Sequence, residues 1–126
     1  MSYLTDRKRA EGLGSAKSGT RAHWNMTISS VALAILVPLF VFTFGPMLGR
    51  PHPEVIAYFA RPFPSVVAAL TIAVGFAHFR HGAQVMIEDY SQGLTRKVLI
   101  LATIIVSYAA AATGVIAVVG LALKGA

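Results

Sequence analysis

The chain has 126 residues, contains no cysteine and carries only five acidic residues. Without cysteine it can form no disulfide, no thiolate metal site and no cysteine nucleophile. Charged residues make up 13% of the chain and hydrophobic residues 56%, which is too little polarity for the surface of a soluble domain of this length. Residues 1–25 are polar and basic and have no apolar centre, so we expect no cleaved signal peptide.

Three long apolar runs occupy residues 28–44, 63–79 with an extension to 87, and 98–123. Each is near or above the roughly 20 residues that a helix needs to cross a bilayer. Backbone polar groups in lipid must pair within their own segment, so the runs are expected to be helices rather than open strands. We therefore predict one all-α membrane protein with three transmembrane helices, at about residues 27–48, 63–88 and 97–123.

The net charge of +6 is distributed unevenly along the chain. Basic residues precede the first run and separate the second from the third: Arg7, Lys8, Arg9, Lys17 and Arg21, then Arg96 and Lys97. The other side has only Arg50, Arg61 and Lys124. The positive-inside rule then predicts a cytoplasmic N-terminus and an external C-terminus. The charge thus indicates topology, and we expect no nucleic acid as a partner.

Local signals predict the remaining organisation. Residues 1–25 contain several glycines and serines, so we expect a basic, irregular cytoplasmic arm, followed by a membrane domain at 26–126. Pro38 should kink the first span or be accommodated by a neighbouring helix. A short surface helix is expected near residues 54–60. Small residues of the third span, at 107, 110, 111 and 114, should permit close packing with another helix.

A histidine stands in the second run with a glycine one turn away on each side. Positions that alternate by three and four residues share one helix face. This face holds Ala68, Thr71, Gly75, His78, Gly82, Val85 and Asp89. Around the helix axis, the direction of Asp89 differs from that of His78 by roughly 20°, and Asp89 lies about 16 Å further along the helix.

Two interpretations of His78 stand side by side. A haem could lie flat where Gly75 and Gly82 leave room, with the imidazole on its iron. An ionisable residue inside a span also suggests a functional site. Alternatively, the histidine is hydrogen-bonded between helices and the glycines serve close packing. His81, His23 and His52 are badly placed for the opposite face of the same ring, so a second haem ligand would come from another chain.

Arg80 and His81 are secondary candidates. Arg80 points about 200° away from His78, and His81 is offset by only about 60°. Each is a candidate for contact with a haem propionate, and each is also an ordinary polar residue near a membrane surface.

Asp89 and Tyr90 end the second span at the predicted cytoplasmic surface. Tyrosine is common in the aromatic belt of membrane proteins, which is the simpler interpretation. A phenol can also donate a hydrogen bond to a quinone carbonyl, and a nearby carboxylate can pair with an arginine or relay a proton.

The pattern His-x-x-x-Gly followed by Asp-Tyr, met here as His78, Gly82, Asp89 and Tyr90, resembles the signature of succinate dehydrogenase (complex II) hydrophobic membrane anchor subunits, the D chains. The resemblance extends over most of the chain, including the basic arm and the position of the histidine in the second of three spans. It implies a bacterial inner membrane protein of respiratory electron transport that forms part of a heteromeric helix bundle.

The resemblance also implies roles for single residues. His78 would be one axial ligand of haem b, with the other ligand from the cytochrome b556 subunit, the C chain. Tyr90 would donate a hydrogen bond to ubiquinone, and Asp89 would support that site. Succinate would be oxidised on a flavoprotein subunit, with an iron–sulfur subunit carrying the electrons. Two other classes remain open: a small transporter subunit, with Arg80, Glu88 and Asp89 on its substrate path, and a structural anchor without a cofactor.

Overall fold

The computed structural model describes residues 4–12, 14 and 19–124. Within this part the chain forms helices only, and no strand occurs. In chain order they are α1 (Asp6–Glu11), α2 (Gly19–Phe44), the 3-10 helix η1 (Gly45–Met47), α3 (His52–Phe59), α4 (Pro62–Tyr90) and α5 (Gly93–Lys124). Three are long and apolar enough to cross a membrane: α2 with η1, α4 and α5. The all-α class with three spans is thus confirmed.

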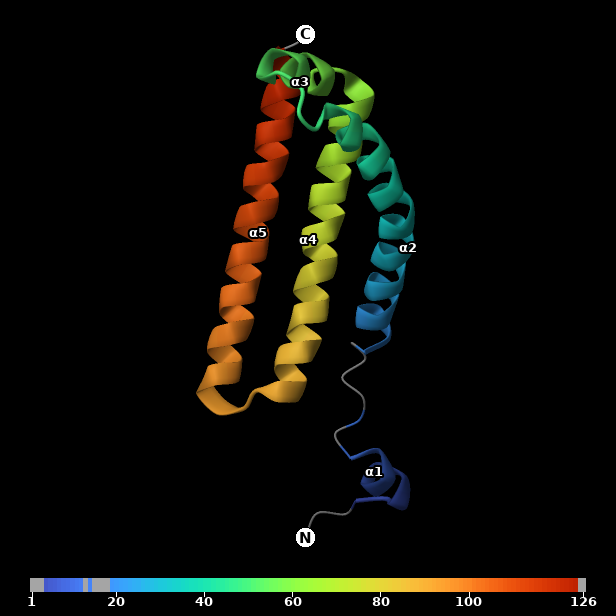
Figure 1. Ribbon diagram of the computed structural model, residues 1–126. Helices are drawn as coiled ribbons and strands as arrows, with labels where there is room; N and C mark the ends of the chain where they lie inside the picture. The colour runs from blue at the N-terminus through green and yellow to red at the C-terminus, as the bar shows by residue number, and fades with distance from the viewer. Residues whose placement is uncertain (1–3, 13, 15–18, 125–126) are drawn as a thin grey trace.

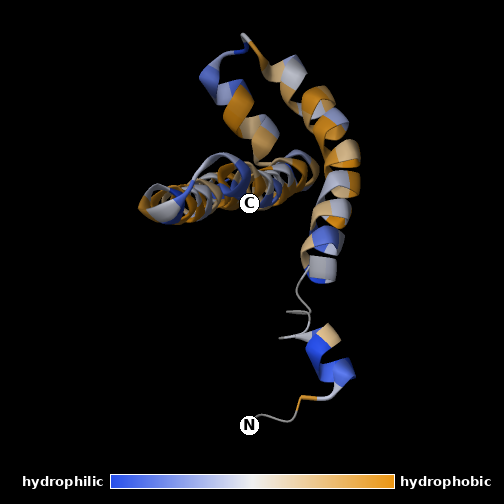
Figure 2. Cartoon of the chain, turned by 90° about the horizontal axis from the view of Figure 1, so that it is seen from below, coloured by the Kyte–Doolittle hydropathy of each residue, from blue (hydrophilic) through white to orange (hydrophobic). Residues whose placement is uncertain are grey.

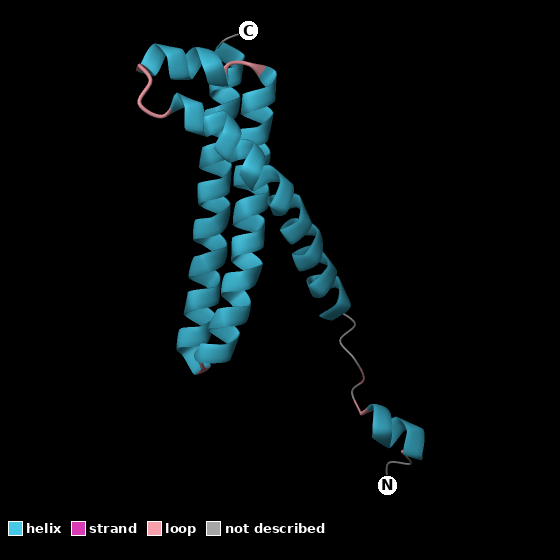
Figure 3. Ribbon diagram, turned by 45° about the vertical axis from the view of Figure 1, so that its right-hand side comes forward, coloured by secondary structure: helices cyan, strands magenta, loops and turns pink. Residues whose placement is uncertain are grey.

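The central helix of the membrane domain is α4, which lies between α2 and α5 (Figure 1). It runs antiparallel to both, and α2 leans away from it toward the N-terminus (Figure 3). The beginning of α2 and the α4–α5 connection lie at one end, and α3 and the C-terminus lie at the other (Figure 1). The ends therefore group as the charge pattern predicts, and which end faces the cytoplasm stays a prediction.

The long helices keep most of their apolar surface on the outside. Only 6%, 22% and 6% of the apolar windows of α2, α4 and α5 are buried within the chain. Hydrophobic residues surround these helices, whereas hydrophilic residues gather at α1 and at the helix ends (Figure 2). A hydrophobic helix surface exposed in this way needs lipid or other transmembrane helices around it.

Buried side chains are few, and they include Phe59 of α3 and Val67 and Ala68 in the first half of α4. The central helix α4 packs against both α2 and α5. In its contact with α5, a Cβ added to Gly114 would lie 3.0 Å from Ile72 Cγ2, and Ser107 of α5 is 2% exposed. The prediction that small residues of the third span allow close packing is therefore confirmed.

The N-terminal arm was predicted incorrectly in part. It is not irregular throughout, because α1 forms within it and α2 already begins at Gly19, before the predicted start of the span. Thr5 Oγ1 caps α1 by accepting from the Lys8 amide at 3.3 Å, and Arg7 pairs with Glu11 at 2.9 Å. Residues 20–25 contain neither glycine nor proline, so the membrane helix extends backward through them. The charge assigned to Lys17 lies outside the described residues.

The connection between the first two spans contains the expected short helix. It runs over His52–Phe59, two residues earlier than predicted, because Pro51 precedes it and Pro53 suits its first turn. Pro38 is accommodated within α2, which continues as one helix to Phe44.

Candidate functional site

His78 lies half-buried on α4 and faces α2. Its Nδ1 is 2.8 Å from the Oγ of Ser29, which α2 brings to the same level of the bundle. In the described part of the chain, no hydrogen bond engages its Nε2. The predicted hydrogen bond between helices is therefore present, but it uses only one of the two ring nitrogens. The other nitrogen keeps the capacity to bind a metal, so this contact does not decide against ligation.

The two glycines beside His78 do not serve packing within this chain. A Cβ added to Gly75 or Gly82 would meet nothing within 4 Å, whereas one added to Gly114 would press against Ile72. Gly75 lines a cavity of about 360 Å³ together with Phe40, Thr71, Ile72, Phe76 and Phe79. Open, largely apolar space of this kind suits one edge of a large planar group or a close partner helix.

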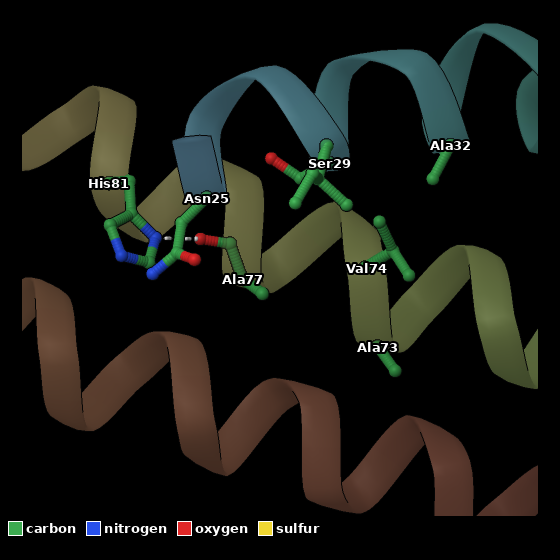
Figure 4. A pocket seen from close by; sticks show the side chains of 8 residues that line it. Asn25, Ser29, Ala32, Ala73, Val74, Ala77 and His81 are labelled. Atoms are coloured by element: carbon green, nitrogen blue, oxygen red, sulfur yellow. Dashed lines mark hydrogen bonds between the residues drawn. The ribbon is translucent and has the colours of Figure 1, made fainter. Parts of the chain in front are cut away.

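A second cavity lies between α2 and α4, and Ser29 is one of the residues that line it. It measures about 410 Å³ and is lined by Asn25, Ile28, Ser29, Ala32, Ala73, Val74, Ala77 and His81. Most of these side chains are small, and Figure 4 shows Val74 of α4 pointing toward Ser29 and Ala32 of α2. Beside this cavity, the hydrogen bond between Ser29 and His78 connects the two helices.

Arg80 and His81 interact with each other on α4. Arg80 Nη2 donates to His81 Nε2 at 3.0 Å, and His81 Nδ1 donates to the Ala77 carbonyl at 2.8 Å. The Arg80 guanidinium also lies 5.4 Å from the ring centre of Tyr108 on α5, within the range of a cation–π contact. Arg80 thus points away from the His78 face, as its 200° offset predicts.

This arrangement bears on the propionate contacts proposed for the pair. Both ring nitrogens of His81 are engaged, so the ring would have to turn before it could donate to an anion. Arg80 has further N–H groups to offer, since guanidinium carries five. A negative group would have to approach it from the α5 side.

The end of α4 exposes the two residues predicted for the quinone site. Tyr90 is 87% exposed, and Asp89 is exposed as well. In contrast, Glu88 accepts from Gln84 at 2.9 Å and pairs with Arg96 of α5 at 3.8 Å. The ion pair between Glu88 and Arg96 connects α4 to α5 across the turn between them. Tyr90 and Asp89 are therefore free to contact a ligand or another chain.

Three residues with a place at the site were missed by the sequence analysis. Ser29 was missed because a single hydroxyl in an apolar span does not by itself predict a contact. That polar residue in α2 was nevertheless the one feature of the sequence that could have pointed to a partner for His78. Tyr108 and Arg96 lie far along the chain from their partners on α4, and no spacing rule connects them. His23 lines a cavity of about 320 Å³ with His81 and Glu88 rather than with His78.

The described residues contain no group of three or more histidine or acidic side chains that could hold a metal ion. A single histidine whose metal is shared with another chain forms no such group. His78, with one free nitrogen beside two open glycines, fits the shared haem that the resemblance implies.

Comparisons with known proteins agree on one family. Residues 1–118 match the family model for the succinate dehydrogenase/fumarate reductase transmembrane subunit. The chain is 46% identical over 123 residues to the succinate dehydrogenase hydrophobic membrane anchor subunit of Paracoccus denitrificans, covering 98% of this chain and 95% of that protein. No solved structure matches the chain significantly.

Proposed function

Since this chain belongs to the succinate dehydrogenase/fumarate reductase transmembrane subunit family, we propose that, as a membrane anchor subunit, it would supply one ligand of haem b and part of a ubiquinone site. His78 would be the ligand, and the cytochrome b556 subunit would supply the other. Bound haem provides a one-electron redox centre within the membrane. Succinate oxidation would take place on a flavoprotein subunit, linked through an iron–sulfur subunit.

One observation carries the haem assignment. The Nε2 of His78 is free, and the helix surface on both adjacent turns is bare at Gly75 and Gly82. Imidazole binds iron through a nitrogen lone pair, and a macrocycle needs several ångströms of free space beside it. Glycines that filled a packing role inside this chain would touch a neighbouring helix, as Gly114 does. These two do not, which supports a group from outside the chain at this position.

The quinone assignment is supported by exposure and position. Tyr90 and Asp89 protrude at the helix end next to the α4–α5 turn, where a head group bound at the surface could reach water. The phenol can donate one hydrogen bond to a quinone carbonyl. Asp89 has no ion pair with any other described residue of this chain, so a cation of another subunit would be its partner.

The transporter alternative has little support. Substrate paths in such proteins use acids deep within a span. Here Glu88 lies near the end of α4 and is paired with Arg96. The family match is also to a transmembrane subunit of succinate dehydrogenase/fumarate reductase rather than to a transporter. We further propose that the protein resides in a bacterial inner membrane with its N-terminus in the cytoplasm, following the positive charge at that end.

The haem assignment is tested in the purified complex with His78→Ala. We expect haem content to fall and the low-spin b-type spectrum to be lost or altered. Gly82→Leu should also lower haem content, because leucine would occupy the open space beside the imidazole. The matched control is Gly120→Leu on α5, where an added Cβ likewise meets nothing within 4 Å. Unchanged haem content and spectrum in His78→Ala would refute the assignment and favour an anchor without a cofactor.

A further inference from the structure

We infer that Ser29 is a positioning residue for His78: it holds the imidazole with its proton on Nδ1 and presents Nε2 as the ligating nitrogen. This inference rests on the proposed haem ligation and goes beyond it by bringing a second helix into the site. The inference is based on the 2.8 Å contact between Ser29 Oγ and His78 Nδ1, which connects residues 49 positions apart in the sequence.

The direction of this hydrogen bond follows from a count of protons. A serine hydroxyl has one proton to donate. Ser29 Oγ donates it to the Met26 carbonyl at 2.9 Å, within its own helix. With its proton given to Met26, the oxygen accepts toward His78, which assigns the imidazole proton to Nδ1. The neutral ring has one proton, which leaves the lone pair on Nε2. This is the tautomer that a histidine needs to bind iron through Nε2.

Ser29 also restricts the rotation of the ring. Histidine ligands generally donate their other ring N–H to a neighbouring acceptor, and this contact fixes the orientation of the ring and raises its basicity. Among the described residues, no other hydrogen bond to the His78 ring occurs, so the contact with Ser29 is the polar contact that fixes its plane. The position of α2 against α4 is thereby coupled to the plane of the imidazole.

Removal of this acceptor has a predictable electronic consequence. An Nδ1–H that donates to oxygen makes Nε2 a stronger electron donor, which favours ferric over ferrous iron. Without the acceptor, the ratio of ferric to ferrous affinity should fall by up to about tenfold. For a one-electron couple, a tenfold change corresponds to a rise of about 59 mV in the midpoint potential.

The test uses the whole purified complex and the pair Ser29→Val and Ser29→Thr. These side chains have nearly the same shape, but only threonine keeps a hydroxyl. Ser30→Ala is the matched control, because Ser30 Oγ donates to the same Met26 carbonyl at 2.8 Å but is exposed and has no contact with His78. The readouts are haem content, the g-values of the ferric haem in electron paramagnetic resonance, and the midpoint potential.

We expect Ser29→Val to retain haem, raise the midpoint potential and change the g-values, because the imidazole plane is released. Ser29→Thr and Ser30→Ala should match the unmodified complex. If Ser29→Val has the g-values and potential of the unmodified complex, Ser29 does not position the ring. His78→Ala separates the two proposals. If His78→Ala loses haem while Ser29→Val keeps the g-values and midpoint potential of the unmodified complex, only the positioning role of Ser29 is overturned. If His78→Ala keeps its haem, the ligand assignment is overturned, and the positioning role with it.

Discussion

Replacement of Tyr90 by phenylalanine should lower quinone reduction without disturbing the fold. The substitution keeps the ring and deletes only the hydroxyl. Tyr90 is 87% exposed, and no other described residue forms a hydrogen bond with its phenol. Removing the hydroxyl therefore breaks no contact inside this chain. Surface substitutions of this kind usually change the free energy of unfolding by less than about 0.5 kcal/mol. Any larger loss of activity must arise from a ligand or a partner subunit.

The expected size follows from one lost hydrogen bond. A single neutral bond contributes about 1 kcal/mol, and a tenfold change in rate or affinity corresponds to about 1.4 kcal/mol. Quinone reduction should thus fall about fivefold. The loss is greater if the carbonyl oxygen gains negative charge during reduction. In enzymes that stabilise a developing oxyanion, removal of one hydrogen-bond donor lowers the catalytic rate by about 10²–10³-fold.

The assay compares two electron acceptors in the same preparation. Succinate–ubiquinone reductase activity should fall, while haem content and succinate oxidation with an artificial acceptor upstream of the quinone stay unchanged. Tyr58→Phe provides the matched control, because Tyr58 lies on α3 at the opposite end of the bundle, 5.4 Å from the ring of Phe59. Quinone reduction and inhibitor sensitivity at the unmodified level in Tyr90→Phe would show that the tyrosine is only an interfacial anchor.

Three further outcomes are expected. Asp89→Asn should lower quinone reduction in the same direction as Tyr90→Phe, through loss of a charge partner in another subunit; an unchanged Michaelis constant and rate for quinone would contradict this. Gly114→Leu should lower the thermal stability of the solubilised complex, because overpacking against Ile72, 3.0 Å from an added Cβ, costs about 1–3 kcal/mol. Gly120→Leu, in open space, should not do so. A reporter active only outside the cytoplasm should be active at the C-terminus and silent at the N-terminus, and the reverse result would invert the proposed topology.

Much of the fold could be predicted from local patterns. Three apolar runs of bilayer length become α2, α4 and α5, because a helix in lipid is the simplest way to satisfy its own backbone. The helical period also placed Arg80 correctly, away from the His78 face, and the structure adds that its guanidinium lies over Tyr108 of α5. The beginning of α2 was predicted too late, since hydropathy marks where the apolar segment begins and not where the helix begins.

The role of the glycines could not be decided from their spacing. Gly75, Gly82 and Gly114 all lie in spans at positions compatible with close helix contact. Only the docking of α5 on α4 shows that Gly114 touches Ile72 while the other two face open space. Small residues permit close approach, but which neighbour approaches depends on the crossing of the helices.

The sequence by itself determined the class of protein, the number of spans and the face of α4 that carries His78, because each depends on hydropathy and helical periodicity within one segment. The tertiary structure decided which ring nitrogen of His78 is engaged and by what. Ser29 meets Nδ1 from another helix, 49 residues away, and such a contact depends on how α2 docks against α4 rather than on any local pattern. Likewise, Glu88 pairs with Arg96 across the turn, which leaves Asp89 and Tyr90 as the exposed residues at the end of α4.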